Sequence, residues 1–341
     1  MRSLYITRYG GPEVLKLREE PDPAPGPGEV LIHVARSGLN FADVTARVGL
    51  YPDAPKPPMV VGYEVAGTVG ALGGGVEGLR VGQRVLAGVR FKGHSNRVVV
   101  SACQALAMPE LMSFEEAAAI PVNYLTAFHM LFHVASLRPG AKVLVHMASG
   151  GVGSAIVQLC RQTEGVELFG TASAAKHDYL RSEGMQHPID YRTQDYAEVV
   201  RKATGGRGVD LVLDPLGGPD WKKGYDLLAP GGHLVAFGWA NMVAGERRRL
   251  SRLVSQFLRM PRFSPMKLMQ DNKSVSGVNL GHLWSELALL RGHMVKLLTL
   301  FEKGAIKPHV DQVFPLSQGA QAHRYLQEGK NRGKVVFDTE G

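Results

Sequence analysis

The residues with the clearest chemical meaning form a small, glycine-rich turn between a strand-like and a helix-like segment. The turn consists of Ala148, Ser149, Gly150, Gly151, Val152 and Gly153. Because glycine has no side chain, the backbone of such a turn can approach a bulky anion closely. The free N–H groups that begin the following helix favour a phosphate at the same point. In this setting the pattern predicts a dinucleotide site, although Ala148 stands where the fingerprint usually begins with glycine; a tight turn without a ligand is the alternative.

The end of the next strand-like segment indicates which dinucleotide the turn would hold. Enzymes that use NAD generally place an acidic residue here, where it binds the ribose hydroxyls. This segment ends without an acid, in Gly170, Thr171, Ala172 and Ser173. Lys176 follows three residues later and would attract the 2′-phosphate of NADP. The sequence therefore favours NADP(H) over NAD(H). Tyr191 is a further candidate contact to the adenine or the phosphate, and an ordinary surface or core tyrosine is its alternative.

The elements around this turn alternate between strand-like and helix-like patterns. Such alternation over residues 142–280 predicts an α/β fold with a parallel, doubly wound sheet. Residues 1–110 instead contain short β-branched segments between Gly and Pro, which predicts a β-barrel or sandwich. Ser113 with Glu116 three positions later predicts the start of a long helix, and Gly304 predicts the end of the last one. The final strand-like segment, 334–338, would return to the first domain.

Composition narrows the class of protein. A length of 341 residues favours two domains, and 45% hydrophobic residues are enough for globular cores. Cys103 and Cys160 are too few for a disulfide framework or a four-cysteine zinc site, so a cytoplasmic location is expected. No run approaches the roughly 18 apolar residues of a membrane helix. The net charge of +8 would suit anionic lipid or phosphorylated ligands; nucleic acid is disfavoured because no recognition motif occurs.

A basic segment interrupts the second half of the chain. Residues 246–267 carry seven Lys and Arg against one Glu, and their apolar residues recur at helical spacing. The pattern predicts one basic amphipathic helix, within an insertion at about 243–270. A solvated or dimer-flanking helix is one interpretation, and contact with an anionic membrane surface is the other.

Several motifs in the same order resemble the quinone oxidoreductase branch of the medium-chain dehydrogenase/reductases. They are GLNFADV (38–44), GLYP (49–52), VGYEVAGTV (61–69), ASGGVG (148–153), DPLGG (214–218) and GKVVF (333–337). Within this branch, HPIDYR, GVNLGHL, IKPHVD and the basic segment are most similar to the synaptic-vesicle membrane protein (vesicle amine transport) homologues.

The resemblance implies a fold and an assembly. A GroES-like catalytic domain would comprise residues 1–121, completed by 288–341, and a Rossmann NADP-binding domain would comprise 122–287. The active cleft would lie between them. Such proteins are commonly homodimers that pair through an edge strand of the Rossmann sheet, and SVSGVNL (274–280) is the candidate strand.

The resemblance also bears on metal and substrate. Zinc-dependent relatives have Cys at the position of Asn40 and His at that of Tyr63; an amide and a phenol do not replace these ligands. His129 and His133 lie four residues apart, but core or surface positions explain such a pair better than a metal. Without zinc, the substrate must already be electrophilic. A quinone or an α,β-unsaturated carbonyl compound would fit, with NADPH as the hydride donor.

By the same resemblance, two groups of residues line the site. The candidates for catalysis are Asn40, Asp43, Tyr51 and Tyr63. The candidates for the nicotinamide end of the cofactor are Asn40, Asn123, Thr126, Phe237, Gly238, Asn279, Leu280, Gly333 and Lys334. Each group has an alternative role. Asn40 could cap its loop, Asp43 could hold the loop, and Tyr51 and Tyr63 could only line the cleft. Asn123 and Thr126 could cap and pack a helix, and Lys334 could face solvent. Two other functions remain open: lipid binding or transfer at a membrane surface, and NADPH binding without turnover.

Overall fold

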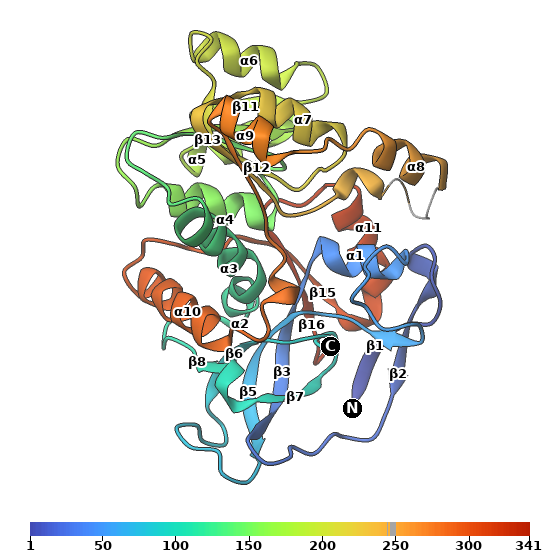
Figure 1. Cartoon of the computed structure of the whole chain (residues 1–341). Coiled ribbons are helices and arrows are strands. Elements are labelled where there is room, and N and C mark those ends of the chain that lie inside the picture. The colour runs from blue at the N-terminus through green and yellow to red at the C-terminus, as the bar shows by residue number, and fades with distance from the viewer. Residues whose placement is uncertain (244, 246–249) are drawn as a thin grey trace. The chain divides into compact units, whose positions relative to one another are not determined.

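The computed structural model describes residues 1–243, 245 and 250–341, and the side chains of all of these except 250 and 252. The chain forms two compact units. The first contains residues 1–125, 245 and 281–341, and the second contains residues 126–243 and 250–280. Figure 1 shows the elements of both.

The first unit is built on two sheets. A three-stranded sheet has the order β2-β1-β4, with β1 at Arg2–Ile6, β2 at Leu15–Glu19 and β4 at Met59–Val60. A seven-stranded sheet has the order β15-β16-β3-β5-β6-β8, and β7 also pairs with β3. Its strands are β3 (Glu29–Leu39), β5 (Glu64–Leu72), β6 (Arg84–Gly88), β7 (Arg97–Ser101), β8 (Ala105–Ala107), β15 (Val310–Pro315) and β16 (Lys334–Asp338). The main helices are α1 (Phe41–Arg47), α10 (Leu287–Glu302) and α11 (Gly319–Gln327).

The C-terminal strand completes the larger sheet, as the sequence predicted. β16 pairs antiparallel with β3 (Figure 1), and in this register Val335 lies opposite Leu39. The residues that flank this pair, Lys334 and Asn40, are therefore brought together from opposite ends of the chain. Apolar side chains such as Leu39, Val335 and Phe337 are buried in one core cluster beneath them.

The second unit contains one parallel sheet with the order β11-β10-β9-β12-β13-β14. The strands are β9 (Lys142–Val145), β10 (Glu167–Ala172), β11 (His187–Asp190), β12 (Val209–Asp214), β13 (Leu228–Ala236) and β14 (Ser274–Gly277). The helices are α4 (Gly151–Cys160), α5 (His177–Ser182), α6 (Tyr196–Ala203), α7 (Pro219–Asp226), α8 (Leu250–Leu258) and α9 (Pro265–Asp271). Numbered within the unit, the order is 3-2-1-4-5-6, which is that of the Rossmann fold. The predicted doubly wound sheet is confirmed.

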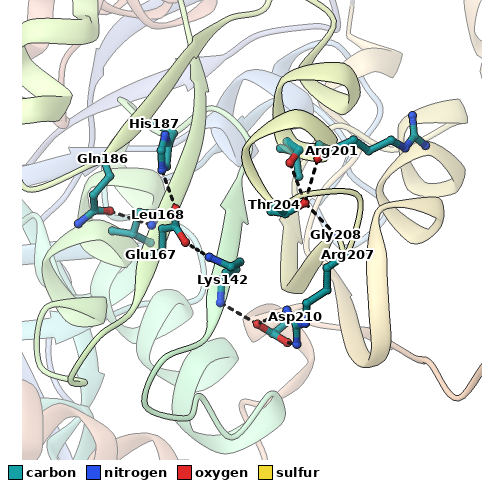
Figure 2. A network of polar contacts seen from close by, with 11 residues as sticks. Lys142, Glu167, Leu168, Gln186, His187, Arg201, Thr204, Arg207, Gly208 and Asp210 are labelled. Atoms are coloured by element: carbon teal, nitrogen blue, oxygen red, sulfur yellow. Dashed lines mark hydrogen bonds and ion pairs between the residues drawn. The ribbon is translucent and has the colours of Figure 1, made fainter.

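A polar network joins the amino ends of four neighbouring strands of this sheet (Figure 2). Glu167 accepts hydrogen bonds from Lys142 Nζ and, at 2.7 Å, pairs with His187 Nε2. The backbone N–H of Lys142 donates to Asp210 at 2.8 Å, and Arg207 also pairs with Asp210. In a parallel sheet of this kind, the glycine turn and the ligand lie at the carboxyl edge. This network lies at the opposite, amino edge, so its role is to hold neighbouring strands together.

The signals at the helix ends are confirmed. The Ser113 hydroxyl accepts from the backbone N–H of Glu116, and the Glu116 carboxylate accepts from that of Ser113. Gly304 has φ +67°, the left-handed conformation that ends α10.

The expectation of one basic helix is wrong. The basic segment does not form one helix over 246–267: α8 ends at Leu258 and α9 begins at Pro265. Pro261 and Pro265 explain the break, because proline lacks the N–H and crowds the preceding turn. Arg247, Arg248 and Arg249 lie outside the described residues.

The helical run Phe114–Val134, of 21 residues, is by length and composition alone able to cross a membrane, although no such run was expected from the sequence. Most of its apolar part is buried inside the molecule, as in the core helix of a globular protein.

Candidate functional site

The glycine turn follows β9 and begins α4. Gly150 is the N-cap residue of this helix, and the first N–H groups of a helix have no acceptor within it. A Cβ atom on Gly153 would lie 2.5 Å from the carbonyl oxygens of both Met147 and Ala148, so only glycine fits there. Around Gly150 the nearest atom would be 3.3 Å away. The start of α4 therefore packs tightly against the backbone of the turn at Gly153, and the turn is more open at Gly150.

The predicted residues at the end of β10 divide into two roles. A Cβ on Gly170 would lie 2.8 Å from the Ala148 side chain, so this glycine allows close packing against the turn. Thr171 is buried, and its hydroxyl accepts from the Met147 N–H at 3.2 Å and contacts His146 Nδ1 at 3.1 Å. Its side chain thus supports the turn from within.

The rest of this segment is more accessible. Ala172 is buried, but Ser173 is half-buried and caps a short helix, Ala174–Lys176. Lys176 is also half-buried. Tyr191 follows β11, and 56% of its surface is exposed. These residues leave the end of β10 without a carboxylate and with one cation.

The loops after β12, β13 and β14 bring further predicted residues to the same carboxyl edge. The Phe237 N–H donates to the Asp214 carbonyl oxygen at 3.0 Å, and a Cβ on Gly238 would lie 2.9 Å from the carbonyl oxygen of Pro215. Asn279 and Leu280 follow β14 after one residue, Val278. The structure therefore gathers the glycine turn, the β10 end and these two pairs along one edge of one sheet.

Asp214, the last residue of β12, is a buried carboxyl group at this edge. One oxygen accepts from the N–H groups of Leu216 at 2.6 Å and Gly217 at 3.1 Å. The other has no hydrogen-bond partner among the described residues. Burial raises the pKa of Asp214 to about 7, and the two backbone N–H groups oppose this shift. No role for this side chain was predicted from the sequence.

In the first unit, a buried polar cluster surrounds Asn40. Asn40 Nδ2 donates to Glu64 Oε1 at 2.8 Å, and Asn40 Oδ1 accepts from Lys334 Nζ at 2.7 Å. Lys334 Nζ also donates to Glu64 Oε1, and only 3% of Lys334 is exposed. Glu64 Oε2 accepts from the Val122 N–H at 2.7 Å. The solvent-facing alternative for Lys334 is therefore excluded.

Asp43 stabilises the backbone around Asn40. Its carboxylate accepts from the N–H groups of Asn40 at 2.8 Å and Gly62 at 2.9 Å, and it lies 3.4 Å from His94 Nε2. His94 is fully buried, and its Nδ1 lies 2.8 Å from the Ser37 hydroxyl. Since every contact of Asp43 is internal, its geometry is that of a loop-holding residue.

The two tyrosine candidates belong to an aromatic group with Phe91. The ring centroids of Tyr51 and Tyr63 are 5.9 Å apart, and those of Tyr63 and Phe91 are 5.4 Å apart. The Tyr63 hydroxyl is buried without a hydrogen-bond partner among the described residues. Burial raises the pKa of Tyr51 to about 12 and raises the pKa of Tyr63 further. Phe91 holds its ring there at φ +74°, which is unusual for a bulky residue.

The remaining candidates lie in two segments. Asn123 and Thr126 are buried inside the helical run Phe114–Val134. The expectation that they begin or cap a helix is therefore wrong. Gly333 has φ +68°, and a Cβ there would lie 2.3 Å from the His309 carbonyl oxygen. This glycine lets β16 begin close to the His309 backbone. The next residue, Lys334, then reaches Asn40.

Asn40 and Tyr63, at the positions of the zinc ligands in zinc-dependent relatives, offer an amide and a phenol, which are poor zinc ligands. No group of three or more His, Cys, Asp or Glu side chains that could hold a metal occurs within the described part of the chain. Asn40 is engaged with Glu64 and Lys334, and Tyr63 is a phenol of raised pKa. The rings of His129 and His133 stack at 4.8 Å, and burial lowers the pKa of His129.

Glu64 is the main residue of this site that sequence reasoning missed. It is an acid within an otherwise apolar strand, VGYEVAGTV, and a buried charge needs a partner. That signal was visible, but its partner Lys334 lies 270 residues away and is brought close only by the pairing of β16 with β3.

Comparison with known proteins agrees with this geometry. The family model described as alcohol dehydrogenase GroES-like domain matches residues 26–129, and the one described as zinc-binding dehydrogenase matches residues 183–337. The human protein named synaptic vesicle membrane protein VAT-1 homolog is 46% identical over 339 residues, which are 99% of this chain and 86% of that protein.

Solved structures agree as well. The human synaptic vesicle membrane protein VAT-1 homolog-like protein is 36% identical, with a TM-score of 0.87 over 100% of this chain and 98% of its own. Escherichia coli quinone oxidoreductase, solved as a complex with NADPH, is 28% identical, with a TM-score of 0.87 over 99% of this chain and 100% of its own. The chain therefore belongs to the VAT-1 homologue family of the medium-chain dehydrogenase/reductase superfamily.

Proposed function

We propose that the protein is an NADPH-dependent reductase that acts, without zinc, on quinones or α,β-unsaturated carbonyl compounds. The observation that carries the proposal is the turn at Ser149–Gly153, which begins α4 beside a β10 end that has Lys176 and no acid. Backbone N–H groups there suit a pyrophosphate, and a lysine suits the 2′-phosphate. The NADPH complex of the related E. coli quinone oxidoreductase supports the choice of cofactor.

The chain's own residues would bind and orient the reactants. When bound, NADPH supplies the hydride. The pyrophosphate would be held by the backbone of the glycine turn, Ser149–Gly153. The 2′-phosphate of the ribose would be held by Ser173 and Lys176. The remaining candidates at this edge, Phe237, Gly238, Asn279 and Leu280, would line the nicotinamide.

The aromatic group would bind the planar substrate, and the unpartnered Tyr63 hydroxyl would donate a hydrogen bond to its carbonyl oxygen. Since the pKa of Tyr63 is raised, this phenol stays protonated at neutral pH. It therefore serves as a donor that stabilises developing negative charge, rather than as a ready source of protons.

Calorimetry with NADPH and NADH tests the cofactor assignment. We expect wild-type protein to bind NADPH more tightly, and Lys176→Ala to weaken NADPH far more than NADH, because only NADPH carries the 2′-phosphate. Equal weakening of both would refute the role of Lys176. Oxidation of NADPH with a panel of quinones and enones tests turnover; tight binding without turnover would favour a non-catalytic role.

A second candidate function is association with an anionic membrane surface. On α8 and α9 the side chains of Phe257 and Leu258 are 71% and 78% exposed, and Met266 and Met269 are also exposed. Such apolar side chains beside basic residues suit the interface of an anionic bilayer.

Flotation with phosphatidylserine vesicles at low salt tests this second candidate. Phe257→Ser with Leu258→Ser should abolish flotation if α8 is the contact. Neutralising Arg247, Arg248 and Arg249, which lie outside the described residues, should weaken it. Leu111→Ser, at an exposed leucine in the other unit, is the matched control. Wild-type protein that does not float would eliminate this candidate.

We also propose a homodimer that pairs through β14. This strand lies at one edge of the second unit's sheet, so its outer side has no strand neighbour among the described residues. Light scattering after gel filtration tests the proposal: Val275→Pro, which would remove a strand N–H, should shift a dimer to a monomer.

A further inference from the structure

Glu64 connects three separate elements of the first unit. Its Oε1 accepts from Asn40 Nδ2, in the residue before α1, and from Lys334 Nζ, at the start of β16. Its Oε2 accepts from the Val122 N–H. A Cβ on Gly38 would lie 2.5 Å from Oε1, so the space for the carboxylate exists because residue 38 is glycine. Both oxygens of a fully buried charge are therefore used, as such a charge requires.

These contacts allow only one orientation of the Asn40 carboxamide. An amide has a donor end and an acceptor end, a carboxylate only accepts, and an ammonium only donates. If the amide of Asn40 were flipped, its oxygen would face Glu64 Oε1, and its NH₂ group would face Lys334 Nζ. Both contacts would then be repulsive, so the charges of Glu64 and Lys334 fix the amide.

The fixed orientation determines what Asn40 can offer a ligand. One Nδ2 hydrogen is directed to Glu64 at 2.8 Å, and the other faces the Gly38 carbonyl oxygen at 3.4 Å. Asn40 Oδ1 accepts one bond from Lys334 and also faces the Asp43 backbone N–H in a capping box, without forming a hydrogen bond to it, so a second lone pair is retained. The unused capacity of Asn40 is therefore that of an acceptor.

We propose that Glu64 is a positioning residue, which turns Asn40 so that its carbonyl oxygen accepts a hydrogen bond from a hydroxyl group of a bound ligand. This inference rests on the proposed reductase function. The hydroxyl belongs either to a ribose of the cofactor or to the reduced form of a quinone. In both cases the recognised chemistry is the same: an O–H donor facing an oxygen that Glu64 and Lys334 hold in place.

An exchange of the amide and the carboxylate tests the inference. Glu64→Gln alone removes the negative charge and replaces one acceptor oxygen with an NH₂ group. In one orientation of the new amide this NH₂ faces the Val122 N–H, and in the other it faces the donors of Asn40 and Lys334, so a donor meets a donor in either case. Asn40→Asp alone places two carboxylates opposite each other. The double variant Asn40→Asp/Glu64→Gln restores three of the four contacts: the new carboxylate at 40 accepts from Lys334 and from the new amide at 64, whose oxygen accepts from Val122. Only the direct contact of Lys334 with residue 64 is lost. An oxygen still faces the ligand.

We expect Glu64→Gln to lower kcat/KM for NADPH-dependent reduction of 1,4-benzoquinone by roughly 10- to 100-fold, the range for loss of a charge-assisted hydrogen bond. The double variant should recover most of that loss. If the hydroxyl belongs to the cofactor, the Kd for NADPH, measured by calorimetry, should follow the same pattern. If it belongs to the hydroquinone, the Kd for NADPH should stay constant while kcat/KM changes.

Two outcomes would overturn the inference. Folded Glu64→Gln protein with wild-type kinetics and NADPH affinity would show a merely structural role, even if its melting temperature fell. A double variant that regains stability but not activity would show that the amide N–H, not the oxygen, meets the ligand. By contrast, wild-type protein that neither binds NADPH nor reduces a quinone would refute the proposed function itself.

Discussion

At the scale of single residues, Tyr63 illustrates how a binding group differs from a structural one. Its hydroxyl is buried without a partner among the described residues, whereas the Tyr196 hydroxyl donates to Asp220 at 3.0 Å. Burying a hydroxyl without a hydrogen bond costs about 1–3 kcal/mol in proteins. Tyr63 is therefore a position where the folded protein gives up stability, as expected of a group kept for a ligand.

We expect Tyr63→Phe to raise the free energy of unfolding, or leave it unchanged, while lowering kcat/KM for a quinone by about tenfold or more. Tyr196→Phe is the matched control and should destabilise the protein by about 1 kcal/mol, because it leaves Asp220 without that donor. Urea unfolding and steady-state kinetics check both variants. Destabilisation by Tyr63→Phe would mean that the hydroxyl has a structural partner, and it would remove the argument for a substrate contact.

At the scale of elements, the glycine turn makes a prediction about packing. Gly153→Ala places a Cβ 2.5 Å from two backbone oxygens, so the turn must shift; we expect lower stability and at least tenfold weaker NADPH binding. Gly292→Ala, in α10, meets nothing within 4 Å and should stabilise the helix by about 0.5–1 kcal/mol. Thermal melts and calorimetry compare the two variants. Unchanged NADPH affinity in Gly153→Ala would separate the turn from the cofactor.

What could be predicted from the sequence depended on how local each signal was. Ser113, Gly304 and the turn at Gly153 act over a few residues, and the alternation of strands and helices determined the sheet around them. Apolar spacing suggested one helix over 246–267, but Pro261 and Pro265 determine where the helices end. The Glu64–Lys334 pair depends on strand register between distant segments, which periodicity does not encode.

At the scale of the whole molecule, buried titratable groups act on stability in opposite directions. Burial lowers the pKa of His146 to about 4 and also lowers those of His233 and His323. The unfolded chain then binds more protons, so their contribution is lost as pH falls from about 6.5. Burial raises the pKa of Asp214 to about 7, so the folded state keeps this proton longer, and the contribution of Asp214 is lost as pH rises from about 4 through 7.

The histidines outnumber Asp214, so we expect wild-type protein to lose stability between pH 6.5 and 5, before most carboxylates are protonated.

Asp214→Asn keeps an acceptor for the Leu216 and Gly217 N–H groups but removes the ionisable proton. The variant should therefore be more stable than wild type at pH 8, and it should lose more stability between pH 8 and 5, because the opposing contribution of Asp214 is absent. Urea unfolding at pH 8, 6.5 and 5 measures both curves. Parallel curves would show that the folded state does not hold a proton on Asp214 near neutral pH, and that the carboxyl edge of the sheet is better solvated than its geometry indicates.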